Sequence, residues 1–478
     1  MINKKNIVAL FVLFSLAIGS CKKWEDHTEV ANQDLTTNLM QALSANPDLS
    51  KFREYILFAG LDTLLQSSKT FTIWAPTNTA LQALDPAVAA DKARLRTFLL
   101  NHISNQSYFT RDVATARQIA MLGGKYNLFS ATKFDLATLV SADKYYSNGV
   151  LHSIDAMAPP LQNIWEFINA TTAQYAQNAY AVALNFNSFD PATATVDSIS
   201  VLTGLPVYRP GTGIVQRNRL LERTSDLKRE DRQYTYFVIQ DANFVVEADS
   251  LKPYYVTGVN ETTDSLTRWN VIKDLVYDTA YATAAEVPAT LVSKSGVRVP
   301  FSSLSVVEVK RMSNGYVYIM NKVDVPTANK FLPIVFEGET PSGFLQTDKS
   351  GNIQYRIRKN PLTQVNYADI LISGHAVTTF YAFYRQNETP SIKYQVFAKA
   401  TNDFSAAFSQ TVNAWHRELG ALQGTLTHVV PLFTAPDAYN EKNLGTVTIT
   451  RYGTVDWRLT SITTGNIMLD YLRLVPLP

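Results

Sequence analysis

The chain contains a single cysteine, Cys21, among 478 residues. One cysteine cannot form a disulfide within the chain, and once it is modified no thiolate chemistry remains. The folded parts must therefore be held together without covalent cross-links. At about 100–200 residues per domain, the length predicts roughly three domains.

The residues before Cys21 follow the layout of a signal peptide. Lys4 and Lys5 form a short basic start, and an apolar run covers residues 7–18. This run is shorter than the roughly 20 apolar residues that a membrane-spanning helix needs. The ending Leu16-Ala17-Ile18-Gly19-Ser20-Cys21 resembles the lipobox of bacterial lipoproteins, in which cleavage leaves an acylated cysteine at the N-terminus. The alternative is an ordinary secretory signal with a chance cysteine.

The lipobox resemblance implies an anchor. We expect residues 1–20 to be the signal peptide, Cys21 to carry the acyl chains and residues 21–33 to form a polar tether. Acyl chains contribute about 0.8 kcal/mol per buried CH₂, so a triacylated cysteine would stay in a membrane. No later stretch of about 18 apolar residues exists, so the rest of the chain is expected to be water-soluble.

The residues after Cys21 predict the destination. Position 22 is Lys, whereas the inner-membrane retention signal of Gram-negative lipoproteins has Asp there. Residues 22–26 resemble the charged export tags of surface lipoproteins in glycan-foraging Gram-negative bacteria. We therefore expect lipid anchoring in the outer membrane, facing the cell surface.

The charge and composition of the chain limit the classes of partner that it is expected to bind. The chain has 43 Lys and Arg against 41 Asp and Glu, so no basic field is available and nucleic acid is not an expected partner. Charged residues make up 18%, below the usual 25% or so. Thr, Asn, Ser, Tyr and Phe take their place, which is typical of β-rich extracellular proteins that bind through aromatic and amide groups.

The first predicted unit, residues 34–160, begins with helical spacing and then changes to a strand. We expect one helix capped by Asp34, a second capped by Asp48 and ending at Gly60, and a third carrying Leu95, Phe98 and Leu99. Residues 70–76 alternate like a strand that ends at Pro76, which cannot donate to a ladder. Thr77 or Asn78 is placed to cap the segment after this strand.

Two short motifs in this unit resemble the conserved boxes of fasciclin (FAS1) domains. The first is Trp74-Ala75-Pro76-Thr77-Asn78, and the second is Asn148-Gly149-Val150-Leu151-His152-Ser153-Ile154-Asp155. His102 falls where the family has a Tyr-His pair, although Asn101 replaces the tyrosine. The resemblance implies an α/β fold with a β-wedge and a helical cap, used in adhesion and in matrix or carbohydrate association.

His102 and His152 are also candidate metal ligands or catalytic groups. The alternative, which the resemblance favours, is that each is a buried histidine that orients the backbone through hydrogen bonds. We expect this structural role.

The second predicted unit, residues 161–326, repeats the pattern in a more divergent form. Residues 234–244 repeat the strand-then-cap pattern of residues 70–81, and residues 313–323 repeat the Asn-Gly turn and strand, so we expect a second FAS1 domain. Tyr318 stands where His152 stood, and no histidine matches His102, which argues against a shared histidine chemistry. Residues 185–232 form an insertion that either binds something or is mobile, and we expect mobility.

The third predicted unit, residues 327–478, consists of eight short strands separated by turns, which predicts a β-sandwich. Residues 465–474 resemble the last strand of galactose-binding-like jelly rolls. That resemblance implies a structural Ca²⁺ held by acidic residues, for which Glu337, Glu339 and Asp470 are candidates. The alternative is that these carboxylates are simply solvated.

Aromatic residues of the third unit can stack on sugar rings. The candidates are Tyr381, Tyr384, Trp415, Tyr452 and Trp457. We single out Tyr452 and Trp457 as glycan-binding candidates, while the alternative is that alternating aromatics such as Phe380 and Phe383 fill the core.

The whole pattern predicts a multidomain chain with α+β and all-β parts: two FAS1 domains followed by a jelly-roll-like β-sandwich. No His-Glu-x-x-His, Gly-x-Ser-x-Gly, P-loop or dinucleotide motif is present, so we expect no enzyme activity and no cofactor other than the Ca²⁺. The leading hypothesis is a lipid-anchored protein acting in adhesion or in matrix and polysaccharide association. The second is a glycan-binding accessory of an outer-membrane polysaccharide transporter.

Overall fold

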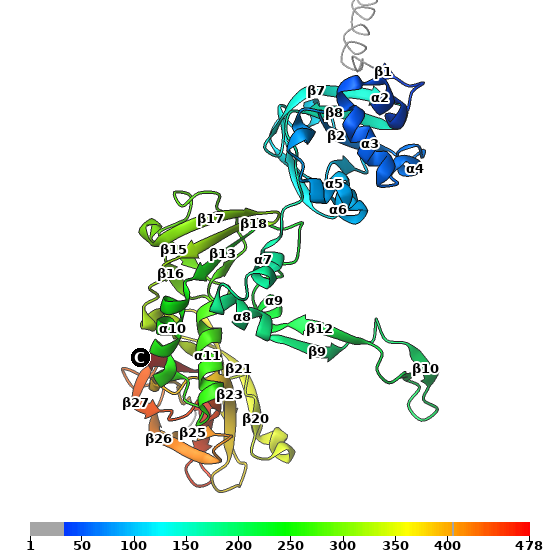
Figure 1. Cartoon of the computed structure of the whole chain (residues 1–478). Coiled ribbons are helices and arrows are strands. Elements are labelled where there is room, and N and C mark those ends of the chain that lie inside the picture. The colour runs from blue at the N-terminus through cyan, green and yellow to red at the C-terminus, as the bar shows by residue number, and fades with distance from the viewer. Residues whose placement is uncertain (1–32, 404–405) are drawn as a thin grey trace, which may run out of the picture. The chain divides into compact units, whose positions relative to one another are not determined.

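The computed structural model describes residues 33–403 and 406–478 (Figure 1). The predictions about the signal peptide, Cys21 and the tether up to residue 32 lie outside these residues. Within the described part of the chain, no helix is long and apolar enough to cross a membrane. The contacts divide the chain into two compact units. The first runs to Ile164 and includes residues 228–233 and 312–314, and the second holds the rest.

The first unit is built on two parallel strands that are buried along their whole length. Strand β2 (Phe71–Pro76) pairs in parallel with β8 (Gly149–Ile154), and the sheet order is β3-β2-β8-β7-β6-β5-β4. The other strands are β1 (Gln33–Asp34), β3 (Ile103–Ser104), β4 (Arg117–Ala120), β5 (Tyr126–Phe129), β6 (Lys133–Phe134) and β7 (Ala137–Tyr146). The predicted strand that ends at Pro76 is confirmed.

Strand β2 separates two hydrophobic cores because successive side chains point to opposite faces. Phe71, Ile73 and Ala75 pack into the core formed with the helices, and Trp74 packs into the core formed with β4 to β6. The helices are α2 (Leu39–Ala45), α3 (Ser50–Phe58), α4 (Asp62–Leu65), α5 (Pro86–Ala90) and α6 (Lys92–Leu100). The third predicted helix is confirmed as α6, whose Leu95, Phe98 and Leu99 are buried.

The predicted caps of the first two helices are wrong. Asn38 caps α2 in a reciprocal capping box with Gln41, so the helix begins four residues after the expected start at Asp34. Asn78, from the loop after β2, accepts a 2.9 Å hydrogen bond from the Lys51 backbone N–H in the first turn of α3. A cap supplied from 27 residues away cannot be read from local sequence, and Asp48 fitted only the local pattern.

The second domain repeats the central strand pair of the first. Strand β13 (Tyr234–Ile239) pairs in parallel with β18 (Gly315–Met320), and the pairing starts at Tyr234 and Gly315 as it starts at Phe71 and Gly149. Both glycines have positive φ, +146° at Gly149 and +139° at Gly315, and a Cβ at either would lie 1.9 Å from the opposite carbonyl oxygen. No other residue fits this approach.

Side-chain hydrogen bonds repeat as well. Asn148 Oδ1 accepts from the backbone N–H of Leu39, at 2.8 Å, and Asn314 Oδ1 accepts from that of Ile164, at 2.9 Å. The Thr72 hydroxyl in β2 forms two hydrogen bonds with the backbone of the segment that follows β3, one as donor and one as acceptor. The Thr235 hydroxyl in β13 forms the same two bonds in the second domain. The second domain is therefore a structural repeat of the first, as predicted.

The second domain carries its own helices and strands around this pair. The helices are α7 (Ile164–Ala170), α8 (Ala176–Ala183), α9 (Arg219–Arg223), α10 (Asp241–Ser250) and α11 (Asn260–Ile272). The strands beyond β13 and β18 are β14 (Val276–Tyr277), β15 (Thr290–Val292), β16 (Arg298–Pro300) and β17 (Val306–Met312).

The 185–232 insertion is not an irregular loop. Strand β9 (Asn185–Phe189) pairs with β12 (Ile214–Asn218), and β10 (Val196–Ile199) pairs with β11 (Pro206–Tyr208), which makes two consecutive hairpin ladders (Figure 1). Helix α9 follows directly and buries Leu220 and Leu221. The expectation of a mobile loop overlooked this pairing because the strands are short and mostly exposed.

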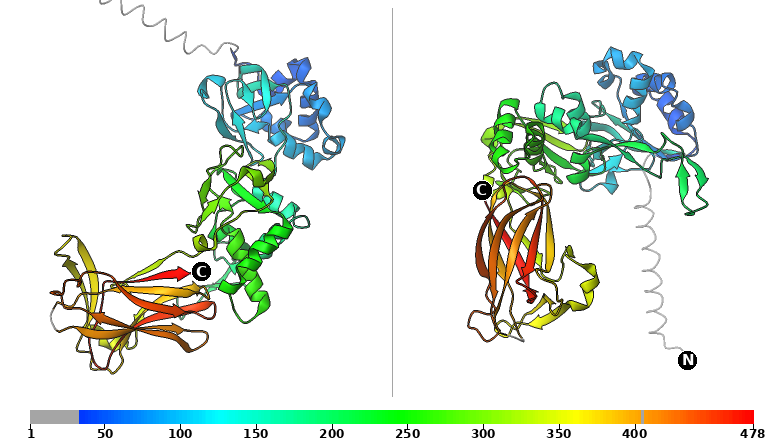
Figure 2. Two further views of the ribbon diagram at one scale, coloured as in Figure 1. Left: turned by 90° about the vertical axis from the view of Figure 1, so that its left-hand side faces the viewer. Right: turned by 90° about the horizontal axis from the view of Figure 1, so that it is seen from below.

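The C-terminal part is a β-sandwich, seen from two sides in Figure 2. Its sheets have the orders β19-β30-β24-β27, β20-β23-β28-β25-β26 and β21-β22-β29. The strands are β19 (Ile334–Glu337), β20 (Gly343–Phe344), β21 (Ile353–Lys359), β22 (Asn366–Ile372), β23 (Tyr381–Thr389), β24 (Lys393–Lys399), β25 (Phe408–His416), β26 (Ala421–Val430), β27 (Lys442–Thr448), β28 (Gly453–Ser461), β29 (Ile467–Leu469) and β30 (Tyr471–Leu477), after the short helix α12 (Thr327–Lys330). The sequence pattern missed β20, β25 and β26.

The second domain and the sandwich form one compact unit because backbone hydrogen bonds join them. The Ser391 N–H donates to the Tyr254 carbonyl at 2.8 Å, and the Tyr452 N–H donates to the Val256 carbonyl at 2.7 Å. The division of the chain into compact units therefore does not coincide with the predicted boundary at residue 326.

Candidate functional site

The aromatic and imidazole rings of the two sequence boxes meet in the core of the first domain. Trp74 is fully buried and lies between Phe134, at 4.5 Å between ring centroids, and His152, at 5.6 Å. Both neighbours are nearly parallel to the indole ring. Strands β2 and β8 position Trp74 and His152 directly opposite each other in the ladder.

His102 is bonded to the backbone through both ring nitrogens. Its Nε2 accepts from the Ala158 N–H at 3.1 Å, so Nδ1 carries the proton and donates to the Phe98 carbonyl at 2.9 Å. Complete burial lowers the pKa of His102 from 6.5 to about 4. The neutral ring joins the end of α6 to residue 158 at the end of the domain.

His152 has the opposite tautomer. Its Nδ1 accepts from the Asp143 N–H at 3.2 Å, and its Nε2 donates to the Tyr108 carbonyl at 3.0 Å. Burial lowers its pKa too. With all four ring nitrogens of His102 and His152 engaged by backbone groups, neither ring presents a lone pair to a metal ion or a substrate.

The remaining box residues fasten separate segments together. Asn148 Nδ2 donates to the carbonyls of Leu65 and Ser67, and Asn78 Nδ2 donates to the Pro47 carbonyl. Asp155 accepts from the Thr138 N–H, at 2.7 Å. Thr77 Oγ1 accepts from the Ala80 N–H at 3.3 Å, and Ala75 and Pro76 are buried members of β2. These residues therefore stabilise the fold, and they do not form a site that is open to a ligand.

Comparison with protein-family models gives the same region. The model described as "Fasciclin domain" matches residues 47–160. Residues 47–160 are a fasciclin domain. The second domain repeats its central strand pair, its glycine and its asparagine contacts, so the chain carries a tandem pair of this fold followed by an all-β sandwich.

Curated relatives match about a quarter of this chain. The rabbit (Oryctolagus cuniculus) transforming growth factor-beta-induced protein ig-h3 is 26% identical over 136 residues, which is 26% of this chain and 20% of that protein. Protein sll1483 of Synechocystis is 28% identical over 142 residues, which is 27% of this chain and 78% of that protein. The chain thus spans about a fifth of the length of ig-h3.

Solved structures show likeness at low identity. A FAS1 domain pair from the insect cell adhesion molecule Fasciclin I is 15% identical, covers 59% of this chain and 98% of its own, and has a TM-score of 0.24. The C-terminal CBM6 module of LamC, a marine laminarinase from Zobellia galactanivorans, is 14% identical, covers 30% of this chain and 99% of its own, and has a TM-score of 0.22.

The structure places the two aromatic residues singled out as glycan-binding candidates, Tyr452 and Trp457, in different surroundings. Trp457 is fully buried, and its Nε1 donates to Gln386 Oε1 at 3.0 Å. Tyr384 is also fully buried, as is Phe380. Tyr452 is half-buried beside Tyr255, with 5.6 Å between their ring centroids. These residues belong to the core and to the junction with the second domain, so Trp457 cannot present a ring to a glycan.

The outward face of the β20-β23-β28-β25-β26 sheet carries the aromatic side chains that alternate with these buried ones. Tyr381 and Phe383 flank Ala382 on β23, and Trp415 follows Ala414 on β25, while both alanines are fully buried. The β28 strand lies between them and places Arg458 directly opposite Phe383 and Asn413. We call Tyr381, Phe383, Trp415, Arg458 and Asn413 the aromatic sheet face.

Arg458 sits between two rings of this face. Its guanidinium carbon is 4.2 Å from the Trp415 ring centroid and 4.7 Å from that of Tyr381. Within the described residues it donates no hydrogen bond, and its Nε is buried without a partner. Cation–π contacts therefore hold a guanidinium whose terminal N–H donors are not used by other residues of the described chain.

The charges beside this face are already paired. Asp456, opposite Trp415 in the ladder, accepts from Arg385 Nε at 2.8 Å and lies 3.4 Å from Arg417 Nη1. Asn413 Nδ2 donates to Thr411 and Thr460, which leaves Asn413 Oδ1 as an acceptor. Rings, amide and guanidinium give the face the chemistry for stacking and hydrogen bonding.

The three acidic residues predicted to hold Ca²⁺ lie near the join of β19 and β30. In the described part of the chain, no group of three or more His, Cys, Asp or Glu side chains has the geometry to hold a metal ion. Asp470 Oδ2 instead lies 2.9 Å from Lys399 Nζ. Yet Glu339 Oε2 is buried without a hydrogen bond, and burial together with the charges of Glu339 and Asp470 raises the pKa of Glu337. Carboxylate oxygens are the ligand type that Ca²⁺ binds, and a calcium site at these residues remains a prediction.

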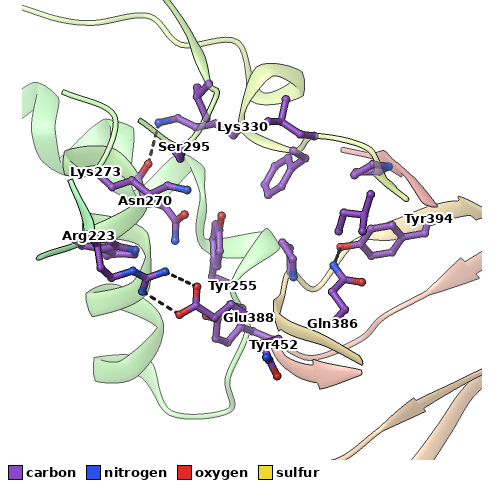
Figure 3. A pocket seen from close by; sticks show the side chains of 18 residues that line it. Arg223, Tyr255, Asn270, Lys273, Ser295, Lys330, Gln386, Glu388, Tyr394 and Tyr452 are labelled. Atoms are coloured by element: carbon purple, nitrogen blue, oxygen red, sulfur yellow. Dashed lines mark hydrogen bonds and ion pairs between the residues drawn. The ribbon is translucent and has the colours of Figure 1, made fainter. Parts of the chain in front are cut away.

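A cavity of about 290 Å³ lies within the second unit where the second domain meets the sandwich (Figure 3). Arg223 lines one side of the cavity and donates two hydrogen bonds, of 2.9 and 2.7 Å, to Glu388. Tyr452, one of the two predicted glycan-binding residues, lines this cavity together with Lys273. No local sequence pattern marks this cavity, because its lining comes from segments more than 200 residues apart.

Proposed function

We propose that this protein is a non-catalytic, lipid-anchored protein of the outer membrane that acts in adhesion or matrix association by binding glycan. The aromatic sheet face carries this proposal. It supplies rings for stacking and the N–H donors of Arg458, while the neighbouring carboxylate of Asp456 is already paired with Arg385. The fasciclin pair is the adhesion-related part of the chain.

The chemistry of the face favours neutral sugars. A sugar ring has an apolar C–H face that stacks on an aromatic ring, and its hydroxyls need donors and acceptors at the edge. Trp415 and Tyr381 supply the rings, and Arg458 supplies donors without the cost of breaking an ion pair. The near balance of acidic and basic residues in the chain gives no long-range attraction to polyanions.

Polysaccharide screening tests this proposal. The full chain should bind at least one neutral polysaccharide, and Trp415→Ala should weaken that binding at least tenfold. Tyr355→Ala is the matched control, because Tyr355 is an exposed aromatic residue on β21, in a different sheet. Equal binding by wild type and Trp415→Ala would contradict the proposal, as would a full chain that retains no polysaccharide.

The alternative role is a glycan-holding accessory of an outer-membrane polysaccharide transporter. The charged stretch at residues 22–26 favours it, because it resembles the export tags of surface lipoproteins in glycan-foraging bacteria. Cross-linking in native membranes followed by purification should then recover a transporter. Recovery of matrix components alone would favour adhesion.

A further inference from the structure

The cavity at the junction of the second domain and the sandwich has a chemistry different from that of the aromatic sheet face. We propose that this cavity is a second binding site, which takes the terminal residue of an acidic glycan, a sugar bearing a carboxylate or a sulfate. The inference does not depend on glycan binding by the sheet face, because the two sites share no residue.

The cationic side chains that line the cavity differ in whether an acceptor already binds them (Figure 3). Arg223 is neutralised by Glu388, and Lys330 Nζ lies 2.8 Å from both Asp274 Oδ2 and the Asn270 carbonyl oxygen. Lys273 also lines the cavity, but among the described residues no acceptor or carboxylate is bonded to its Nζ. One ammonium is therefore available to an anion.

The surroundings of Lys273 make an anionic partner favourable. Its side chain is partly buried, and burial lowers its pKa, with Lys330 and Arg223 acting in the same direction against the opposing charge of Asp274. A bound anion would replace the lost solvation of the ammonium and offset the repulsion of its cationic neighbours. In such a partly dry site, the ion pair with a ligand is stronger than on an open surface.

The rest of the lining suits a sugar ring. Tyr255, Phe331 and Tyr452 contribute aromatic surface, while Asn270 and Gln386 contribute amides that can bond hydroxyls. A volume of about 290 Å³ lies at the small end of ligand sites. It accommodates the end of a glycan chain rather than its middle, and that is why we infer a terminal residue.

The backbone that forms the sandwich side of the cavity is irregular. The register of β23 shifts between Gln386 and Thr389, and Glu388 has φ of +52°, a left-handed conformation that is uncommon for residues other than glycine. The bulge turns Glu388 toward Arg223 of the second domain. Bulges and strained residues of this kind cluster at binding sites.

Titration calorimetry with the full chain tests the proposal. The probes are a galacturonic acid disaccharide and a sulfated disaccharide, which distinguish the two anions, with a neutral disaccharide as control. The wild-type protein should bind at least one acidic probe, more weakly as salt is raised. Lys273→Met should reduce that affinity at least tenfold, and Lys273→Arg should retain it.

Each outcome decides the proposal. Because Lys273→Met removes a charge without removing the stem, its melting temperature should stay near that of the wild type, and Lys273→Gln serves as a second neutral variant. Trp415→Ala should leave acidic binding unchanged. No binding of either acidic probe, full affinity in both neutral variants, or loss of acidic binding in Trp415→Ala would overturn the proposal.

Discussion

His152 and Tyr318 make the same hydrogen bond in two successive domains. His152 Nε2 donates to the Tyr108 carbonyl at 3.0 Å, and Tyr318 Oη donates to the Tyr281 carbonyl at 2.9 Å. The two residues occupy the fourth position of β8 and of β18. Since an imidazole and a phenol serve the same place, the fold needs a buried donor there, and not the acid–base chemistry of histidine.

Removing the His152 donor should lower the stability of the fold without abolishing any metal binding. His152→Ala leaves the Tyr108 carbonyl and the Asp143 N–H without their partner, so we expect a loss of about 1–3 kcal/mol in the free energy of unfolding. Chemical denaturation measures this loss. Stoichiometric zinc in the purified wild-type protein, absent from the variant, would contradict the structural role.

The buried histidines predict a dependence of stability on pH. Burial lowers the pKa of both His102 and His428 from 6.5 to about 4, so the unfolded chain binds more protons than the folded one between these values. Stability should be fully present above pH 6.5 and should fall as the pH is lowered toward 4. Thermal melts across this range measure it, and a melting temperature that stays constant from pH 7 to 4.5 would contradict the prediction.

The two glycines that come after Asn148 and Asn314 should tolerate no side chain. A Cβ at Gly149 would meet the Phe71 carbonyl oxygen at 1.9 Å. We expect Gly149→Ala to destabilise its domain by more than about 2 kcal/mol, because the backbone itself must move. Gly124→Ala is the control: it also has positive φ, +84°, but nothing lies within 4 Å, so its cost should be near 1 kcal/mol. Equal costs would show that conformation, and not contact, decides.

Calcium should act at the acidic residues between β19 and β30. We expect added Ca²⁺ to raise the melting temperature of the full chain and a chelator to reverse the rise. Lys399→Met should enlarge the rise, because Lys399 competes for Asp470. If Ca²⁺ is not bound, Lys399→Met should only destabilise the protein, since it leaves a buried carboxylate unpaired.

Lipid anchoring should depend on Cys21. Cys21→Ser should leave the protein soluble or unprocessed, since the acyl chains supply the membrane affinity. Fractionation of cells that express each form measures this. A variant that still sediments with outer membranes like the wild type would show that something else holds the protein there.

Local patterns in the sequence predicted most of the fold and little of the binding surface. The strand at 70–76, the Asn-Gly turn that leads into a strand and the repeat in the second domain are consequences of buried runs and tight turns. The parallel pairing of the two strands came from the structure. The capping of α3 by Asn78 and the bulge at Glu388 depend on contacts distant in sequence, so no local pattern reveals them.

The error at Trp457 has a simple physical origin. Successive residues of a strand face opposite sides of a sheet, so a shift of one position exchanges core and surface. The β28 strand places Trp457 in the core and Arg458 on the outward face, and the flanking residues do not show which side is covered. Tyr381 and Trp415 were among the sequence candidates and lie on the outward face.

The most direct test of glycan binding by the aromatic sheet face is titration of the full chain with the neutral oligosaccharide selected by screening. The account predicts measurable affinity in the wild type and in Tyr355→Ala, and at least a tenfold loss in Trp415→Ala with an unchanged melting temperature. Wild-type affinity in Trp415→Ala, or the same loss in Tyr355→Ala, would contradict it.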